Sequence, residues 1–194
     1  MIEKNSEISM KRGSIIGSIF QLISHLNKIL GKGKKHMKVV FLDVDGVINS
    51  LQFCDKNKDE MIDRQGVALI KKLIEQTGAV IVMSSGWRLW FDDNMKPKIG
   101  DAQYLYNILI EYGIELYDKT PDFSTEEIRT KRTFSHVKAK EISAWLKEKK
   151  NIERYIVLDD LDLKNEEINA HLVRTDGKIG ITKDDVEYAI KMLN

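Results

Sequence analysis

The chain has 194 residues, of which 42% are hydrophobic and 31% charged, so it can bury one good core but is short for two domains. Its single cysteine, Cys54, has no partner for an intrachain disulfide or a zinc site, which favours a reducing, cytoplasmic setting. Residues 1–37 carry seven Lys or Arg and two Glu, whereas residues 38–194 carry 24 basic and 28 acidic residues. This balance argues against a strongly basic nucleic-acid-binding domain in residues 38–194.

Residues 1–37 are predicted to form a basic extension that contains an amphipathic helix. Apolar side chains recur at spacings of three and four over residues 14–30, with basic residues on both flanks. Polar residues interrupt this stripe, so the segment is neither a transmembrane span nor a secretory signal. Three interpretations stay open. The helix packs on its own domain or on a second subunit, it binds a membrane surface as a peripheral anchor, or it is a loosely ordered extension.

The segment 38–50 is the most informative stretch of the chain. The apolar run 39–42 ends on Asp43, with Asp45 two positions on and Gly46 next, which predicts a strand buried on both faces of a parallel sheet. Open α/β sheets bind ligands at the carboxyl ends of their strands, where both carboxylates would lie. Their oxygens suit Mg²⁺, and one carboxylate can serve as a nucleophile. The structural alternative is an acidic turn.

The next elements repeat the pattern of an apolar strand followed by polar side chains. Residues 49–63 are polar and predicted to form a loop or flap, and residues 67–77 a helix closed by Gly78. A second buried strand over residues 79–83 ends at Ser84-Ser85-Gly86-Trp87-Arg88. Residues 88–101 are predicted to form a loop.

The second half of the chain continues the alternation of helices and strands. We predict a helix over residues 104–112, a short strand over 114–117 and a long charged loop over 119–135. Lys138 directly precedes the next predicted helix, over 139–149. A strand over residues 155–158 ends at Asp159 and Asp160, and a short strand over 172–174 precedes a terminal helix over 184–193, with Thr182 or Asp184 near its N-cap. This alternation predicts an α/β fold for residues 38–194: a doubly wound, Rossmann-like parallel sheet flanked by helices.

Four separated segments together resemble a known family. Asp43-Val44-Asp45-Gly46-Val47, the serine after the second strand, the lysine before a helix and Asp159-Asp160 resemble, in order, the four motifs of haloacid dehalogenase (HAD) superfamily phosphatases. The resemblance covers about residues 38–194. Three segments are similar to a small capless subgroup that is linked with RNA-repair proteins: Ser-Ser-Gly-Trp-Arg, Glu141-Ile142 with Trp145-Leu146, and the Leu-Asp-Asp strand end. The resemblance implies a HAD-like fold without a large cap domain, and Mg²⁺ as cofactor.

The resemblance also implies roles for the acidic residues. Asp43 would be the nucleophile that takes up the phosphoryl group as an aspartyl-phosphate, held against Mg²⁺. Asp45 would be the general acid and then the general base, and only its backbone carbonyl would bind the metal. Asp159 and Asp160 would complete the metal site, with Asp160 as the direct ligand.

The remaining roles concern phosphate binding. Ser84 would hold a phosphoryl oxygen, and Ser85 is the competing assignment. Lys138 would balance the charge of nucleophile and phosphate, as a compact ammonium can. Other cations close by compete for this role: Lys131, Arg132 and Lys140. Arg88 would bind a second phosphate or a nucleic-acid backbone, and Trp87 would stack on a base or, more commonly for such a residue, lie in the core.

The absence of a segment long enough for a cap domain bears on the substrate. An open site admits the end of a polymer, whereas capped relatives close over small metabolites. We therefore expect a Mg²⁺-dependent phosphomonoester hydrolase that acts on a large or extended substrate, such as a nucleic-acid terminal phosphate. A phosphoprotein or a membrane-associated phosphate is the alternative substrate. A non-catalytic module that binds a partner through residues 14–30 is the alternative function.

Overall fold

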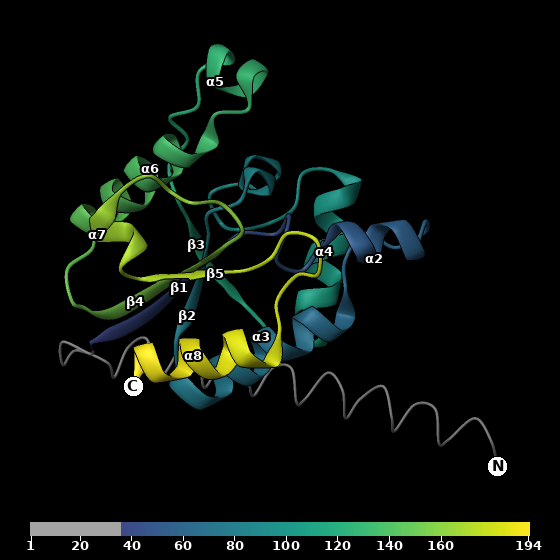
Figure 1. The fold of residues 1–194 in the computed structure, drawn as a ribbon, viewed down its shortest axis with the longest axis horizontal. Helices are drawn as coiled ribbons and strands as arrows, with labels where there is room; N and C mark the ends of the chain where they lie inside the picture. The colour runs from purple at the N-terminus through teal and green to yellow at the C-terminus, as the bar shows by residue number, and fades with distance from the viewer. Residues whose placement is uncertain (1–35) are drawn as a thin grey trace, which may run out of the picture. The chain divides into compact units, whose positions relative to one another are not determined.

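The computed structural model describes residues 36–194, and a five-stranded parallel sheet runs through them (Figure 1). Its strands are β1 (Met37–Leu42), β2 (Val80–Met83), β3 (Leu116–Lys119), β4 (Ile152–Asp159) and β5 (Leu172–Arg174). Their order in the sheet is β3-β2-β1-β4-β5, and every neighbouring pair is parallel. The chain winds outward from β1 to β3 and then crosses to the other side of β1, so the predicted doubly wound α/β fold is confirmed.

Helices cover both faces of the sheet, and the strand sequences show which face each helix meets. The helices are α2 (Leu51–Lys56), α3 (Arg64–Thr77), the 3₁₀ helix η1 (Gly86–Trp90), α4 (Gly100–Glu111), α5 (Glu126–Lys131), α6 (Phe134–Glu148), α7 (Glu166–Asn169) and α8 (Lys183–Leu193). Val40 and Leu42 of β1 join the core cluster that includes residues of α3, α4 and α8. Val39 and Phe41 join the cluster with α6 and α7.

The alternation along β1 places the first acidic residue of the site. Side chains of a strand point to opposite faces in turn, so Asp43 continues the face of Phe41, beneath α6. Phe41 meets Trp145 of α6 edge-on, with ring centroids 5.3 Å apart. Because this contact fixes α6 on the face that Asp43 shares, a residue in the first turns of α6 can reach the carboxyl end of β1.

The ends of α3 and α8 carry the capping residues that their sequences predict. Asp63 accepts a hydrogen bond from Gln65 N–H at the start of α3, and Gly78 ends α3 in the left-handed region with φ 66°. Thr182 caps α8 in a capping box with Asp185, which settles the N-cap in favour of Thr182 over Asp184.

Several predicted boundaries are wrong. The predicted loop 88–101 contains part of η1 and the start of α4, and β3, β4 and α4 begin two to four residues away from their predicted starts. The segment 49–63 contains α2, and 119–135 contains α5, where we predicted loops. The helix α6 begins at Phe134, so Lys138 lies inside it rather than before it. Both missed helices have six residues and no buried side chain, so they leave no apolar periodicity to detect.

The insertion between β3 and α6 is the largest departure from a plain doubly wound sheet. It holds only α5, which stands out beyond α6 in Figure 1, so the HAD-like fold carries no large cap domain. The strand β1 begins at Met37, one residue before the predicted domain boundary. The helix predicted over residues 14–30 lies outside the described residues. Within residues 36–194, the helices are too short and too polar to cross a bilayer.

Candidate active site

The carboxyl ends of β1, β2 and β4 bring the predicted motifs together. The backbone N–H of Asp43 donates to Leu158 O at 2.9 Å, and that of Ser84 donates to Leu42 O at 3.0 Å. These bonds extend the parallel ladder one residue beyond the strands. Asp43 therefore lies beside Ser84 on one side and beside the end of β4, Asp159, on the other.

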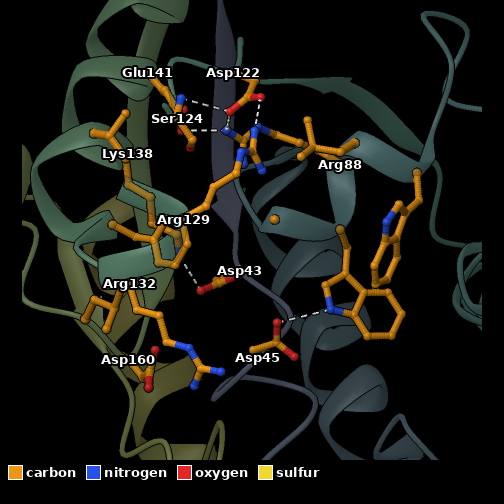
Figure 2. Close-up of a pocket in the computed structure, with 17 residues that line it drawn as sticks. Asp43, Asp45, Arg88, Asp122, Ser124, Arg129, Arg132, Lys138, Glu141 and Asp160 are labelled. Atoms are coloured by element: carbon orange, nitrogen blue, oxygen red, sulfur yellow. Dashed lines mark hydrogen bonds and ion pairs between the residues drawn. The ribbon is translucent and has the colours of Figure 1, made fainter. Parts of the chain in front are cut away.

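Three carboxylates and one ammonium form the centre of the site. Asp43, Asp159 and Asp160 each offer a carboxylate oxygen, and these oxygens lie within 4.8 Å of one another. The ammonium of Lys138, in α6, donates one hydrogen bond to Asp43 Oδ2 and another, of 2.7 Å, to Asp159 Oδ2. The structure thus brings the predicted lysine to the predicted nucleophile, and Figure 2 shows the two side chains pointing toward each other.

The electrostatics of this group indicate an excess of negative charge. Burial and the charge of Asp43 raise the pKa of Asp159 to about 7, and the same two causes raise the pKa of Asp160. Burial alone would lower the pKa of Lys138, but the charges of Asp43 and Asp159 outweigh it and raise this pKa. One ammonium thus faces three carboxylates, and a further cation would offset the excess of negative charge in this group.

The donor set fits Mg²⁺, which prefers carboxylate and other hard oxygen ligands. Asp43 and Asp159 each bond through both oxygens. Asp43 accepts from Val44 N–H at 2.8 Å and from Lys138, and Asp159 from Leu161 N–H at 3.0 Å and from Lys138, so Asp160 has the least engaged carboxylate of the three. Two glycines crowd Asp160: a Cβ built on Gly46 or on Gly177 would lie 2.5 Å from its carboxylate group. The backbone therefore holds this carboxylate closely beside Asp43.

Asp45 lies apart from the acidic group, as a general acid should. Its carboxylate accepts hydrogen bonds from Trp87 Nε1–H at 3.1 Å and from Asn49 Nδ2–H at 3.0 Å. Although Asp45 is open to solvent, protein atoms surround much of its carboxylate. This desolvation and the charge of Asp43 raise its pKa, which the bond from Trp87 opposes. A raised pKa suits a carboxylic acid that must carry a proton near neutral pH.

The two serines after β2 are both buried but are bonded differently. Ser85 Oγ accepts from Trp87 N–H at 3.3 Å and so caps η1. Ser84 is 1% exposed, and within the described part of the chain its Oγ has no hydrogen-bond partner. A buried hydroxyl without a partner is costly, so Ser84 is the serine whose hydroxyl is free to bond a ligand oxygen.

Arg88 lies in the wall of the pocket, but its guanidinium is already paired. Its Nη2 lies 2.7 Å from Glu141 Oε2 and 3.4 Å from Asp122 Oδ1, and Nη1 donates to Ser85 O at 2.8 Å. Arg88 and Glu141 are 4% and 1% exposed. This buried ion pair ties the turn after β2 to α6, three residues beyond Lys138. These contacts indicate that Arg88 positions the two segments, and a role in phosphate binding stays a prediction.

The site opens into two pockets. The first, of about 650 Å³, is lined by Asp43, by apolar residues and by cations of α5 and its end: Trp87, Leu89, Trp90, Phe134, Val137, Leu161, Arg129 and Arg132. The second, of about 720 Å³, is lined by Arg174 and Lys178 among others. Asp45 and Asp160 line both pockets, so the candidate acid and metal ligand lie where the two meet.

Sequence reasoning missed several residues of this site. Asn49 bonds Asp45 and Arg129 lines the first pocket, and neither residue was assigned a role; the ion pair of Glu141 with Arg88 was not foreseen either. Trp87 was singled out for stacking or for the core. It is 7% exposed and lies against Trp90, with ring centroids 5.0 Å apart. Glu141 belongs to a segment that carries the family resemblance, but that resemblance gave it no ion pair with Arg88. Its spacing of one helical turn from Lys138 was a further signal of a place at the site.

A family model described as "HAD domain in Swiss Army Knife RNA repair proteins" matches residues 39–186. The match contains all four motifs and every residue of the acidic group. No curated protein and no solved structure matches the chain.

Proposed function

The chain belongs to the family of HAD domains in Swiss Army Knife RNA repair proteins, and from this premise we propose that it hydrolyses terminal phosphomonoesters of nucleic-acid strands with Mg²⁺. Family membership itself supports a HAD-type phosphohydrolase. The observation that carries the finer proposal is the convergence of Asp43, Asp159 and Asp160, with Lys138 bonded to two of them.

The first half of the reaction uses Asp43 and Asp45. A carboxylate oxygen of Asp43 attacks phosphorus, forming an aspartyl-phosphate as the bond from phosphorus to the ester oxygen breaks. Asp45 donates its proton to that leaving oxygen. Trp87 and Asn49 hold Asp45 in place, so its proton is presented to one position.

The second half regenerates the enzyme. Asp45, now ionised, takes a proton from a water molecule that attacks phosphorus, and the bond from phosphorus to Asp43 breaks to release inorganic phosphate. Lys138 stays bonded to Asp43 and offsets the charge of the phosphoryl group, while the free hydroxyl of Ser84 bonds one of its oxygens. Mg²⁺ held by Asp43 and Asp160 would neutralise the phosphate and orient it for in-line attack.

The shape of the site supports a chain-like substrate. With no large cap domain, the site stays open to solvent, and two pockets meet at Asp45 and Asp160. A strand end can enter such a site while the rest of the polymer remains outside. The description of the family, which names RNA repair, supports nucleic acid as the polymer.

The proposal is tested with the full chain and a set of phosphomonoesters, with Mg²⁺ and with EDTA. The set contains oligonucleotides with a 5′ or a 3′ phosphate, nucleotides, phosphopeptides and phosphoinositides. We expect Mg²⁺-dependent release of phosphate, fastest from an oligonucleotide end. Asp43→Asn should abolish it, and Asp184→Asn, an exposed aspartate in the first turn of α8, should not.

Three results would contradict parts of the proposal. No hydrolysis of any ester would refute the activity. A preference for phosphopeptides or phosphoinositides would refute the substrate class. Full activity in EDTA would refute the metal role of Asp43 and Asp160.

A further inference from the structure

We infer that Arg132 binds a second phosphate of the substrate, the phosphodiester next to the terminal phosphate that Asp43 attacks. The inference rests on the proposed function and names the part of the strand that the site recognises. It assigns a binding role to the end of α5, a segment that the phosphoryl-transfer mechanism does not use.

The backbone fixes Arg132 at the mouth of the pocket. Arg132 ends α5 in the left-handed region, with φ 52° and ψ 37°, and its N–H donates to Ile128 O. A non-glycine residue in this conformation carries strain, which the surrounding turn must hold. From there Arg132 lines the same pocket as Asp43, and Figure 2 shows its side chain reaching toward the space bounded by Asp43, Asp45 and Asp160.

Among the cations of residues 36–194 that line the first pocket, Arg132 is the one whose charge has no ion-pair partner. Lys138 bonds Asp43 and Asp159, and the guanidinium of Arg88 is paired with Glu141. Arg129 pairs with Asp122. By contrast, no ion pair or hydrogen bond to another of residues 36–194 engages the guanidinium of Arg132, which is exposed. A free guanidinium offers a planar fork of donors that matches two oxygens of one phosphate.

The rest of the pocket favours a nucleic-acid strand over a phosphopeptide. The pocket that Arg132 lines also has an apolar part, with Leu89, Trp90, Phe134 and Leu161. A base can cover such a surface while its neighbouring phosphodiester meets the arginine, because a strand carries both at every step. A peptide next to a phosphorylated side chain offers a neutral backbone, which gives the arginine no charged partner.

The first test compares substrates that differ in the second phosphate. kcat/KM is measured for p-nitrophenyl phosphate, for a mononucleotide, and for tetranucleotides with a 5′ or a 3′ phosphate. Arg132→Asn removes the charge and suits the left-handed backbone, because asparagine tolerates it. We expect this variant to lower the ratio of the better tetranucleotide's kcat/KM to that of p-nitrophenyl phosphate by about 10- to 100-fold, since a charge-assisted hydrogen bond is lost.

The matched control is Lys131→Asn. Lys131 is the preceding residue, carries the same charge and pairs with Glu127 outside the pocket. This control should keep the parent's ratio, and thermal melting should show that both variants are folded. A ratio unchanged in Arg132→Asn overturns the inference. So does an equal loss on all substrates, which would place Arg132 on the phosphate that Asp43 attacks.

The second test needs no turnover. Binding of the phosphorylated tetranucleotides is measured by fluorescence anisotropy in the Asp43→Asn background, with and without Arg132→Asn, over a range of salt concentrations. We expect weaker binding and a salt dependence that is shallower by about 0.7 to 1 in the slope of log K against log salt, the contribution of one phosphate contact. Equal affinity and slope overturn the inference. If the parent hydrolyses nothing, the proposed function fails, and this test still decides the role of Arg132.

Discussion

Gly177 gives the sharpest test of how the backbone holds Asp160. Gly177 lies in the turn after β5, and an alanine Cβ there would be 2.5 Å from Asp160 Oδ2, where ordinary contact begins near 3.4 Å. Oδ2 must therefore move by about 0.9 Å in Gly177→Ala. Because Mg²⁺ demands near-octahedral ligands at about 2.0–2.1 Å, a shift of this size breaks direct ligation.

Gly177→Ala should lower the affinity for Mg²⁺ far more than the stability of the fold. The crowded atom is the end of a flexible side chain that can turn away, so the free energy of unfolding should change by less than about 1 kcal/mol. The affinity for Mg²⁺ should fall about 10- to 100-fold, the usual effect of disturbing what orients a metal ligand. Gly46 contacts the same carboxylate, but its φ of 74° would add backbone strain to any substitution there.

Isothermal titration calorimetry with Mg²⁺, and the Mg²⁺ dependence of phosphate release, measure the effect. Gly100→Ala is the matched control because nothing lies within 4 Å of its added Cβ and its φ is not positive. It should bind Mg²⁺ as the parent does. Parent-like Mg²⁺ affinity in Gly177→Ala would refute the assignment of Asp160 as a direct ligand.

Three further predictions follow from the hydrogen bonds and pKa values of the site. Trp87→Phe removes the hydrogen bond that lowers the pKa of Asp45, so this pKa should rise. The alkaline limb of the pH profile of kcat/KM, measured from initial rates, should then move to higher pH. An unmoved limb would contradict the role of Asp45 as the general acid. Glu141→Gln leaves the buried charge of Arg88 with the longer contact to Asp122 as its one remaining ion pair among residues 36–194. Urea denaturation should then show a loss of about 3 kcal/mol, and a loss below about 1 kcal/mol would show that the pair is not structural. Without metal, Asp159 titrates near pH 7 in the folded state and near its ordinary 3.8 when unfolded. The folded state therefore binds more protons between these values, and stability falls as pH rises through them. Asp159 belongs to the acidic group beside the proposed ligands, and a bound Mg²⁺ would favour its ionised form. Mg²⁺ should therefore raise Tm more at about pH 8 than at about pH 5, and an equal shift by scanning fluorimetry would contradict the metal site.

The sequence was most informative where polar or charged side chains directly follow an apolar strand. Runs of apolar residues that end at Asp43, Ser84 and Asp159 indicate buried parallel strands, and parallel strands place their carboxyl ends at one edge. The convergence of these segments could therefore be predicted without coordinates. The start of α6 relative to Lys138 could be predicted only to within a few residues, because Phe134 to Val137 carry no clear signal for the start of a helix.

The contacts between distant segments could not be predicted. Arg88 and Glu141 are 53 positions apart, and Trp87 and Asp45 are 42 apart, so no periodicity links the partners. The short helix α5 is stabilised by its Thr125 cap rather than by a buried face, and its end sets the direction of Arg132. Such details depend on how the loops pack, which the alternation of strands and helices does not determine.

The central claim, that Asp43 carries the phosphoryl group, can be measured by acid quenching during turnover of an oligonucleotide with a radiolabelled terminal phosphate. We expect label bound to the protein, released by hydroxylamine as an acyl phosphate is, located in the peptide that contains Asp43 and missing from Asp43→Asn. Rapid turnover with no label in that peptide, or label that persists in Asp43→Asn, would contradict the account.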